Sequence, residues 1–201
     1  MSIKNIVFDL GGVLIDFDPE RMIGDCGLTE YSDLIFKYVF GSEHWLDMDK
    51  GVQSVEQAVD NMLVSLPEEI HGNVRRMIID REQMMPPIKE MTPIIDSLYG
   101  SGYRLFVLTN CAKWFHEFKN NIPSIEKFEG FIVSADYGII KPDKRIYKIL
   151  LETFDLKAEE CFFIDDNPAN TDAAQSLGFK THCFKDRNFD LLKQQLGIAI
   201  L

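Results

Sequence analysis

The sequence predicts an α/β fold: a Rossmann-like, doubly wound parallel sheet that carries an inserted all-helical cap. Three observations predict it. Five short apolar runs, each bounded by Gly, Asp, Asn or Lys, have the length and the β-branched or aromatic character of buried parallel strands. Segments with helical spacing alternate with most of these runs, which is the order of a parallel sheet joined by crossover helices. A long stretch near the N-terminus shows helical periodicity alone and interrupts the alternation.

The predicted strands and the helices between them follow a regular order. The strands are residues 3–8, 103–108, 130–134, 161–164 and 180–183. The helices expected to alternate with them are residues 88–98, 143–154 and 168–177. The last of these has Pro168 in its first turn and Gly178 just past its end, which are usual start and stop signals of a helix. In such a sheet the active residues lie at the carboxyl edge of the strands.

The segment that departs from this alternation is residues 17–85. Helical periodicity is visible at residues 31–40, 55–66 and 68–81. A connection of this length is unusual for a simple crossover. We therefore predict a helical cap domain at residues 17–85 and a core domain made of residues 1–16 and 86–201. The alternative is a helical layer packed continuously on the sheet.

Composition limits the classes of partner. The chain has 201 residues, a hydrophobic content of 46% and a formal net charge of −11. Nucleic acids and anionic membranes require clustered cations, so neither is expected as a partner. The four cysteines are far apart with no CxxC pair, no apolar run approaches the roughly 20 residues of a membrane helix, and the first predicted strand begins close to the N-terminus. We expect a cytoplasmic protein that is a monomer or a weak homodimer.

Polar residues gather where the predicted strands end. In chain order they are Asp9, then Thr109 and Asn110, then Lys141 before a helix, then Asp165 and Asp166. Each of them alone is more often a helix cap, a turn residue or a solvated side chain. Together they place acids, a hydroxyl and an ammonium at one edge of one sheet, which favours a catalytic site.

These residues lie in segments that resemble the four ordered motifs of the haloacid dehalogenase superfamily. The segments are FDLGGVL with Asp9, LTN with Thr109, KPDKRIY with Lys141, and FIDDNPAN with Asp165 and Asp166. The resemblance covers the whole chain, because the helical insertion lies where that superfamily places its small cap. The chain resembles the capped sugar-phosphate phosphatases, a group that includes α-D-glucose 1-phosphate phosphatases.

The residue chemistry also supports phosphoryl transfer. A free Asp has a pKa of about 3.9, so Asp9 is expected to be ionised and to attack phosphorus without a base, giving an aspartyl-phosphate that water hydrolyses. A divalent cation, which an oxygen-rich site identifies as Mg²⁺, would relieve the repulsion between carboxylate and phosphate.

The resemblance then assigns the remaining roles. It implies metal ligation by Asp9, Asp166 and the backbone carbonyl of Gly11, with Asp165 as a further ligand or behind the ligands. It implies that Thr109 and the amide of Asn110 hold phosphate oxygens. Lys141 would neutralise charge that develops in the transition state.

Gly11 stands where most phosphatases of the superfamily carry a second Asp that protonates the leaving group. Three alternatives could make up for the missing proton donor. A cap residue such as Asp16, His44 or Asp49 takes its place, water acts alone, or the substrate has a leaving group that departs without protonation. The sugar of an anomeric sugar phosphate is a good leaving group, so the expected partner is a small phosphorylated metabolite such as a sugar 1-phosphate. Trp45 is a candidate to stack on the sugar face, with a place in the cap core as the alternative.

Two other functions remain as alternatives. Haloacid dehalogenases also lack the second Asp and work without metal, but such an enzyme has no use for the acidic pair Asp165 and Asp166, which would repel Asp9. A non-catalytic phosphate-binding scaffold of the same fold would be expected to have damaged motifs, whereas Asp9, Thr109, Lys141 and Asp166 are all present. The sequence therefore favours a Mg²⁺-dependent phosphatase.

Overall fold

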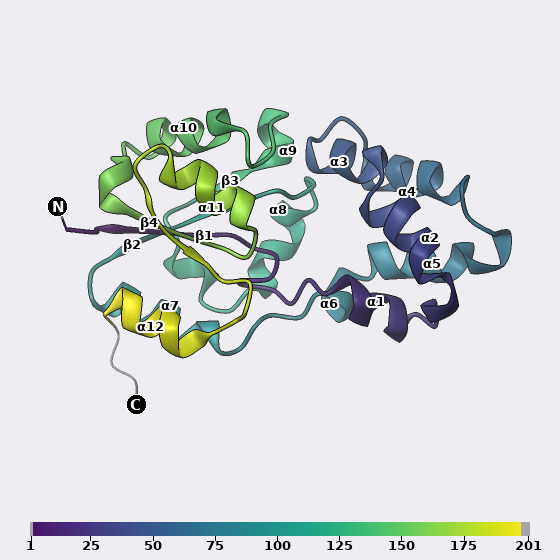
Figure 1. The fold of residues 1–201 in the computed structure, drawn as a ribbon, viewed down its shortest axis with the longest axis horizontal. Helices are drawn as coiled ribbons and strands as arrows, with labels where there is room; N and C mark the ends of the chain where they lie inside the picture. Colours follow the sequence, from purple (N-terminus) through teal and green to yellow (C-terminus); the bar gives the residue numbers. More distant parts are fainter. Residues whose placement is uncertain (1, 198–201) are drawn as a thin grey trace.

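The computed structural model describes residues 2–197 and contains a five-stranded sheet in the order β3-β2-β1-β4-β5, with every pair of neighbours parallel (Figure 1). The strands are β1 (Asn5–Phe8), β2 (Arg104–Thr109), β3 (Gly130–Val133), β4 (Cys161–Asp165) and β5 (Lys180–Cys183). The α/β class and the doubly wound parallel sheet are thereby confirmed. Four of the predicted strands shift by one or two residues at their ends, and Ser134, expected at the end of a strand, begins a short helix.

The register of the central strand explains why the polar residues meet. Phe8 at the end of β1 pairs with Val107 on β2 and with Ile164 on β4. The three strands therefore end at nearly the same level. Asp9 is the residue that follows β1. It lies between Thr109 and Asp165, which are the last residues of the flanking strands.

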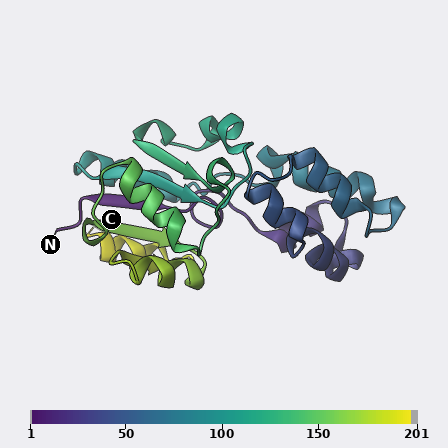
Figure 2. The same ribbon diagram turned by 90° about the horizontal axis from the view of Figure 1, so that it is seen from above.

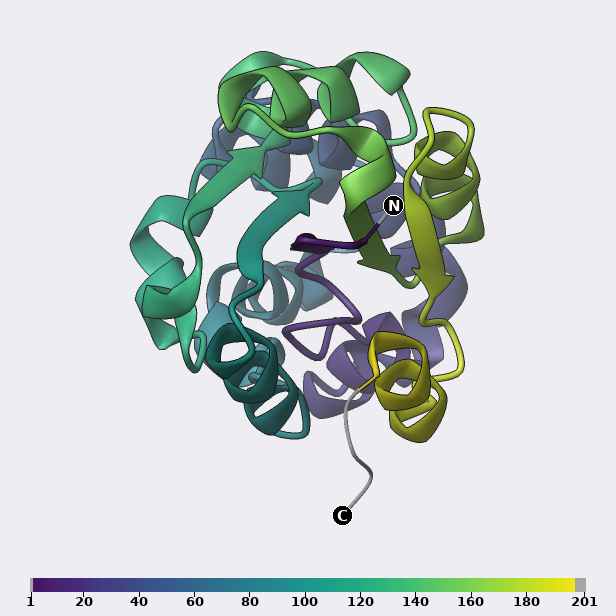
Figure 3. The same ribbon diagram turned by 90° about the vertical axis from the view of Figure 1, so that its left-hand side faces the viewer.

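Helices cover both faces of the sheet (Figure 3). They are α7 (Met91–Gly100), α8 (Phe115–Phe118), α9 (Ser134–Tyr137), α10 (Lys144–Thr153), α11 (Pro168–Gln175) and α12 (Phe189–Leu196). Alternate residues of β1 point to opposite layers, as the period of a strand requires. Val7 belongs to the buried cluster of α10 and α11, whereas Ile6 and Phe8 belong to the cluster that includes α7 and α12.

A second group of helices lies beyond the carboxyl edge of the sheet (Figures 1 and 2). These helices are α1 (Pro19–Asp25), α2 (Ser32–Ile35), α3 (Glu43–Asp49), α4 (Val55–Leu63), α5 (His71–Ile79) and α6 (Arg81–Met84). The helix expected at residues 31–40 is instead a 3-10 turn, the short α2 and a π-helical turn at Phe36–Phe40. No helix within residues 2–197 combines the length and the apolar character needed to cross a membrane.

Two linkers join these helices to the sheet, and they run side by side. The amide of Asp16 donates to the carbonyl of Pro86 at 2.8 Å, and the amide of Ile88 donates to the carbonyl of Leu14 at 2.9 Å. Buried apolar residues continue through this junction, from the sheet through Ile15 into the cap. The division of the chain into a core and a cap at residues 17 and 85 stays a prediction.

Candidate functional site

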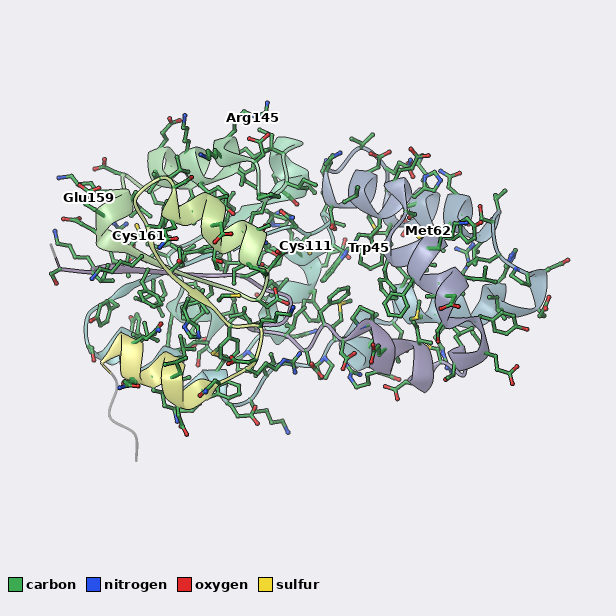
Figure 4. All side chains as sticks on the ribbon, viewed as in Figure 1. Trp45, Met62, Cys111, Arg145, Glu159 and Cys161 are labelled. Carbon is green, nitrogen blue, oxygen red and sulfur yellow. The ribbon has the colours of Figure 1, made fainter. Side chains whose placement is uncertain are left out.

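A cavity of about 300 Å³ lies between the carboxyl edge of the sheet and the cap. Its polar floor is made of Asp9, Thr109, Asn110, Lys141, Asp166 and Asn170. Its apolar walls include Phe17, Trp45, Met48, Ile78, Met85 and Trp114. All the residues expected at the site except Asp165 line this cavity, and Gly11 lies in its wall. Figure 4 shows Trp45 of the cap and Cys111 of the core close to where the two parts meet.

Asp9 is held at the tip of β1 by two donors. The amide of Leu10 donates to its Oδ1 at 2.7 Å, and the ammonium of Lys141 lies 2.8 Å from the same oxygen. Only 7% of Asp9 is exposed. A carboxylate can be buried in this way because it has charged and hydrogen-bonding partners.

Asp165 lies under the floor of the cavity and supports it. Its Oδ2 is 2.6 Å from the Nζ of Lys141, and its Oδ1 accepts from the amide of Asn167 at 2.8 Å. The side-chain amide of Asn170 donates to both oxygens, at 3.0 and 3.1 Å. The hydroxyl of Tyr147 donates to the carbonyl of Asn170 at 2.9 Å. These contacts fix the Asp165 carboxylate, which in turn orients the ammonium of Lys141.

The acidic groups at the site outnumber the cation. One carboxylate oxygen each from Asp9, Asp165 and Asp166 lies within 4.8 Å of the others. Burial raises the pKa of Asp9 to about 8, although Lys141 opposes the shift. Burial and the neighbouring Asp165 also raise the pKa of Asp166. Asp9 in the metal-free protein is therefore harder to ionise than a free Asp, and its ionisation for attack on phosphorus stays a prediction.

This set of donors fits a divalent metal ion. With three carboxylates and one ammonium, the fully ionised site carries two negative charges in excess, and its donors are the hard oxygens that Mg²⁺ prefers. Burial disfavours the charge of Lys141, but the adjacent Asp165 and Asp9 more than offset this and raise its pKa. Lys141 therefore stays a cation beside Asp9, and it offsets only one of the three negative charges that the carboxylates carry when all are ionised.

Asn110 has a role that the sequence did not reveal. Its Oδ1 accepts from the amide of Lys141 at 2.7 Å, and its Nδ2 donates to the carbonyl of the same residue at 3.0 Å. The side chain therefore clamps the backbone of the Lys141 loop to the end of β2. An Asn after a strand is typical of a turn, so no signal in the residue pattern distinguishes this clamp.

Gly12 allows the loop after β1 to approach Asp166. Its φ is +70°, and a Cβ at this position would lie 2.5 Å from the Oδ2 of Asp166. Only glycine tolerates both conditions. Trp45 packs its ring 5.1 Å from that of Phe40 in the cap and also lines the cavity, while its stacking on a sugar stays a prediction.

Comparison with known proteins shows the family. The family model of haloacid dehalogenase-like hydrolases matches residues 6–184. The chain belongs to this family.

Its relatives within the family catalyse more than one reaction. A sesquiterpene phosphatase of Aspergillus oryzae is 29% identical over 181 residues, which is 88% of this chain and 87% of the relative. A (S)-2-haloacid dehalogenase of a Pseudomonas species is 23% identical over 209 residues, which is 96% and 86% of the two chains. The chain is thus a haloacid dehalogenase-like hydrolase, and phosphatases are among its relatives.

Solved structures of the family have the same fold. A family enzyme of Bacteroides thetaiotaomicron, crystallised with magnesium and inorganic phosphate, superposes with a TM-score of 0.72 at 23% identity, covering 90% of this chain and 93% of that chain. A predicted family hydrolase of Porphyromonas gingivalis superposes with a TM-score of 0.69 at 26% identity, covering 96% and 99%. The family resemblance stated from the four motifs is confirmed.

Proposed function

We propose that this haloacid dehalogenase-like hydrolase is a Mg²⁺-dependent phosphatase that hydrolyses a small phosphomonoester through an aspartyl-phosphate on Asp9. The observation that carries the proposal is the group of three neighbouring carboxylates, Asp9, Asp165 and Asp166, of which the first two pair with the ammonium of Lys141. The relatives that are phosphatases support it, as does the neighbouring structure with magnesium and phosphate.

The chain's own residues would carry out the steps. A carboxylate oxygen of Asp9 attacks phosphorus, the bond from phosphorus to the ester oxygen breaks, and water later releases the phosphate from Asp9. Thr109 and the amide of Asn110 hold phosphate oxygens, while Lys141 balances charge in the transition state. Asp9, Asp166 and the carbonyl of Gly11 would hold Mg²⁺, which would supply positive charge to offset the repulsion of the carboxylate and the phosphate.

The acidic pair favours this reaction over dehalogenation. Metal-free chemistry at Asp9 would leave Asp166 close to Asp165 in a partly buried site, where the two carboxylates repel each other. A metal ion relieves that repulsion, so the pair has a physical reason to be present in a phosphatase.

The walls of the cavity favour a leaving group with apolar surface. Trp45, Met48 and Ile78 line the side that faces away from the floor. The sesquiterpene phosphatase among the relatives is named for a substrate of that character. We therefore add phosphates of apolar alcohols as a substrate class beside the anomeric sugar 1-phosphate, which stays a prediction from Gly11. A cytoplasmic location and a monomer or weak homodimer also stay predictions.

The test is hydrolysis of p-nitrophenyl phosphate with and without Mg²⁺, in the parent and in Asp9→Asn. We expect Mg²⁺-dependent turnover in the parent and none above background in the variant. Asp60→Asn is the matched control, since Asp60 is an exposed cap residue paired with Arg75. Absence of turnover in the parent would favour a scaffold, and metal-independent turnover of 2-chloropropionate would favour a dehalogenase. Geranyl phosphate compared with glucose 1-phosphate then ranks the two substrate classes.

A further inference from the structure

The missing carboxylate at Gly11 leaves the proposed reaction without a proton donor beside Asp9. The ester oxygen of an ordinary alcohol leaves slowly unless it is protonated, and a positioned acid accelerates that step by about 10²–10⁴-fold. We propose that Asp49, at the end of cap helix α3, donates this proton and then activates the attacking water. The assignment rests on the proposed phosphatase function.

Asp49 is the cap carboxylate that lies at the cavity and could donate the proton there. Among the cap residues described by the structure, it is the only acid that lines the cavity shared with Asp9, Gly11 and Thr109. Its partly buried side chain accepts a hydrogen bond from the side chain of Trp45, which also lines the cavity.

The other two candidates from the sequence lie elsewhere. Asp16 forms ion pairs with Arg21 at 3.2 Å and with Arg187 at 2.6 Å. His44 has its Nδ1 3.3 Å from the side-chain amide of Gln53. Neither Asp16 nor His44 lines the cavity. Of the three candidate proton donors that the sequence offered, only Asp49 therefore lies at the cavity.

A chain of hydrogen bonds ties Asp49 to the phosphate side of the site. The hydroxyl of Ser134 donates to the backbone carbonyl of Asp49 at 2.5 Å. The same hydroxyl oxygen accepts from the amide of Cys111 at 2.9 Å. Cys111 follows Thr109 and Asn110, so one buried side chain links the cap acid to the loop that would hold phosphate.

The turn after Asp49 fits closely against the core. Gly51 has a φ of +68°, and a Cβ there would lie 2.3 Å from the carbonyl oxygen of Ala135. Ala135 follows Ser134 in α9, and α3 lies beside α9 in Figure 1. Glycine at this position lets the turn after α3 lie directly against α9, next to the end of β3.

The protonation state of Asp49 suits the task. Burial raises its pKa to about 7, against the opposing hydrogen bond from Trp45 and the charge of Lys141. The carboxylates of Asp9 and Asp166 face the same cavity from the floor. A group that titrates near neutrality both gives and takes a proton readily.

Over one catalytic cycle, Asp49 gives up one proton and regains one, and Asp9 forms and breaks one bond to phosphorus. As Asp9 forms its bond to phosphorus, the ester bond breaks and the electron pair stays on the leaving oxygen, which takes the proton of Asp49 and departs as a neutral alcohol. Asp49, now a carboxylate, removes a proton from the water that attacks phosphorus. The bond between Asp9 and phosphorus then breaks, which restores ionised Asp9 and protonated Asp49.

The experiment compares an alkyl phosphate with p-nitrophenyl phosphate in Asp49→Asn. The alkyl alkoxide needs a proton, whereas p-nitrophenolate leaves without one, so we expect kcat on the alkyl ester to fall by about 10²–10³-fold. With p-nitrophenyl phosphate the variant should show a burst of nitrophenolate equal to the enzyme concentration, because the phosphorylated enzyme accumulates. The limb of the kcat profile near pH 7 should disappear on the alkyl ester.

The controls separate a local effect from a damaged fold. Asp49→Glu keeps the carboxyl group and should recover part of the alkyl turnover, and Asp47→Asn changes an acid of the same helix outside the cavity and should leave it unchanged. Melting curves check that each variant folds. An equal loss of turnover on both esters, or the absence of a burst, would overturn the role of Asp49 but not the phosphatase function. No turnover of either ester by the parent overturns the phosphatase function and this assignment with it.

Discussion

The ammonium of Lys141 lies 2.8 Å from Oδ1 of Asp9, and the Lys141 side chain is only 1% exposed. The contact joins the loop before α10 to the tip of the central strand. Oδ2 of Asp165 lies 2.6 Å from the same ammonium. Lys141 is thus the cation that permits two carboxylates to be buried next to each other.

Removal of this cation is expected to destabilise the protein. In Lys141→Met, Asp9 and Asp165 lose their shared partner, and breaking a buried ion pair in this way costs about 3–5 kcal/mol in the free energy of unfolding. Urea unfolding near pH 8 without metal measures the loss. Lys144→Met alters an exposed neighbour and should change stability by less than about 0.5 kcal/mol. Equal effects of the two substitutions would contradict the pairing.

The stability of the metal-free protein should fall as the pH rises. The folded protein raises the pKa of Asp9 from 3.8 to about 8 and that of Asp49 from 3.8 to about 7. Between the ordinary and the raised values the folded state binds more protons than the unfolded state, so folding is favoured at the acidic end and weakened toward the alkaline end. Unfolding followed in EDTA from about pH 5 to 8 measures the slope. Asp49→Asn should make the slope shallower, and an unchanged slope would refute the contribution of Asp49.

Magnesium is expected to stabilise the folded protein through Asp166. At about 100 times its Kd, a ligand that binds only the folded state adds about 2.7 kcal/mol. For a chain of this size that corresponds to a rise in Tm of about 5–10 °C. Asp166→Asn should abolish the rise without lowering the Tm of the metal-free protein, because it also removes a carboxylate that is repelled by Asp165. A full shift in the variant would show that Asp166 is not a ligand.

Gly12 should be intolerant of substitution for a reason beyond its backbone angle. Gly27→Ala places a side chain at a φ of +67° in open space, and should cost only the left-handed strain of about 1–2 kcal/mol. Gly12→Ala has a φ of +70° and in addition brings Cβ to 2.5 Å from Asp166. We expect a larger loss of stability and, unlike Gly27→Ala, a loss of phosphatase turnover. Similar results for the two variants would argue against the close approach.

The parallel sheet could be predicted because its signals are local. The β5 strand has the predicted bounds, and the other strands differ by one or two residues at one or both ends. The positions of Asp9 and Thr109 at strand ends follow from this local pattern together with the parallel order. The helix expected at residues 31–40 was wrong as a single helix, since periodicity does not distinguish α, 3-10 and π turns.

The sequence by itself determined the fold class, the family and the residue types gathered at one sheet edge, because strand length, residue alternation and motif spacing are properties of neighbouring residues. Only the tertiary structure decided that Asp165 supports Lys141, that the side chain of Asn110 clamps the Lys141 loop, and that Ser134 holds Asp49 over the cavity. Each of these is a contact between distant segments, and its geometry depends on how helices and strands pack. The same packing buries Asp9 and thereby raises its pKa, which no pattern in the chain expresses.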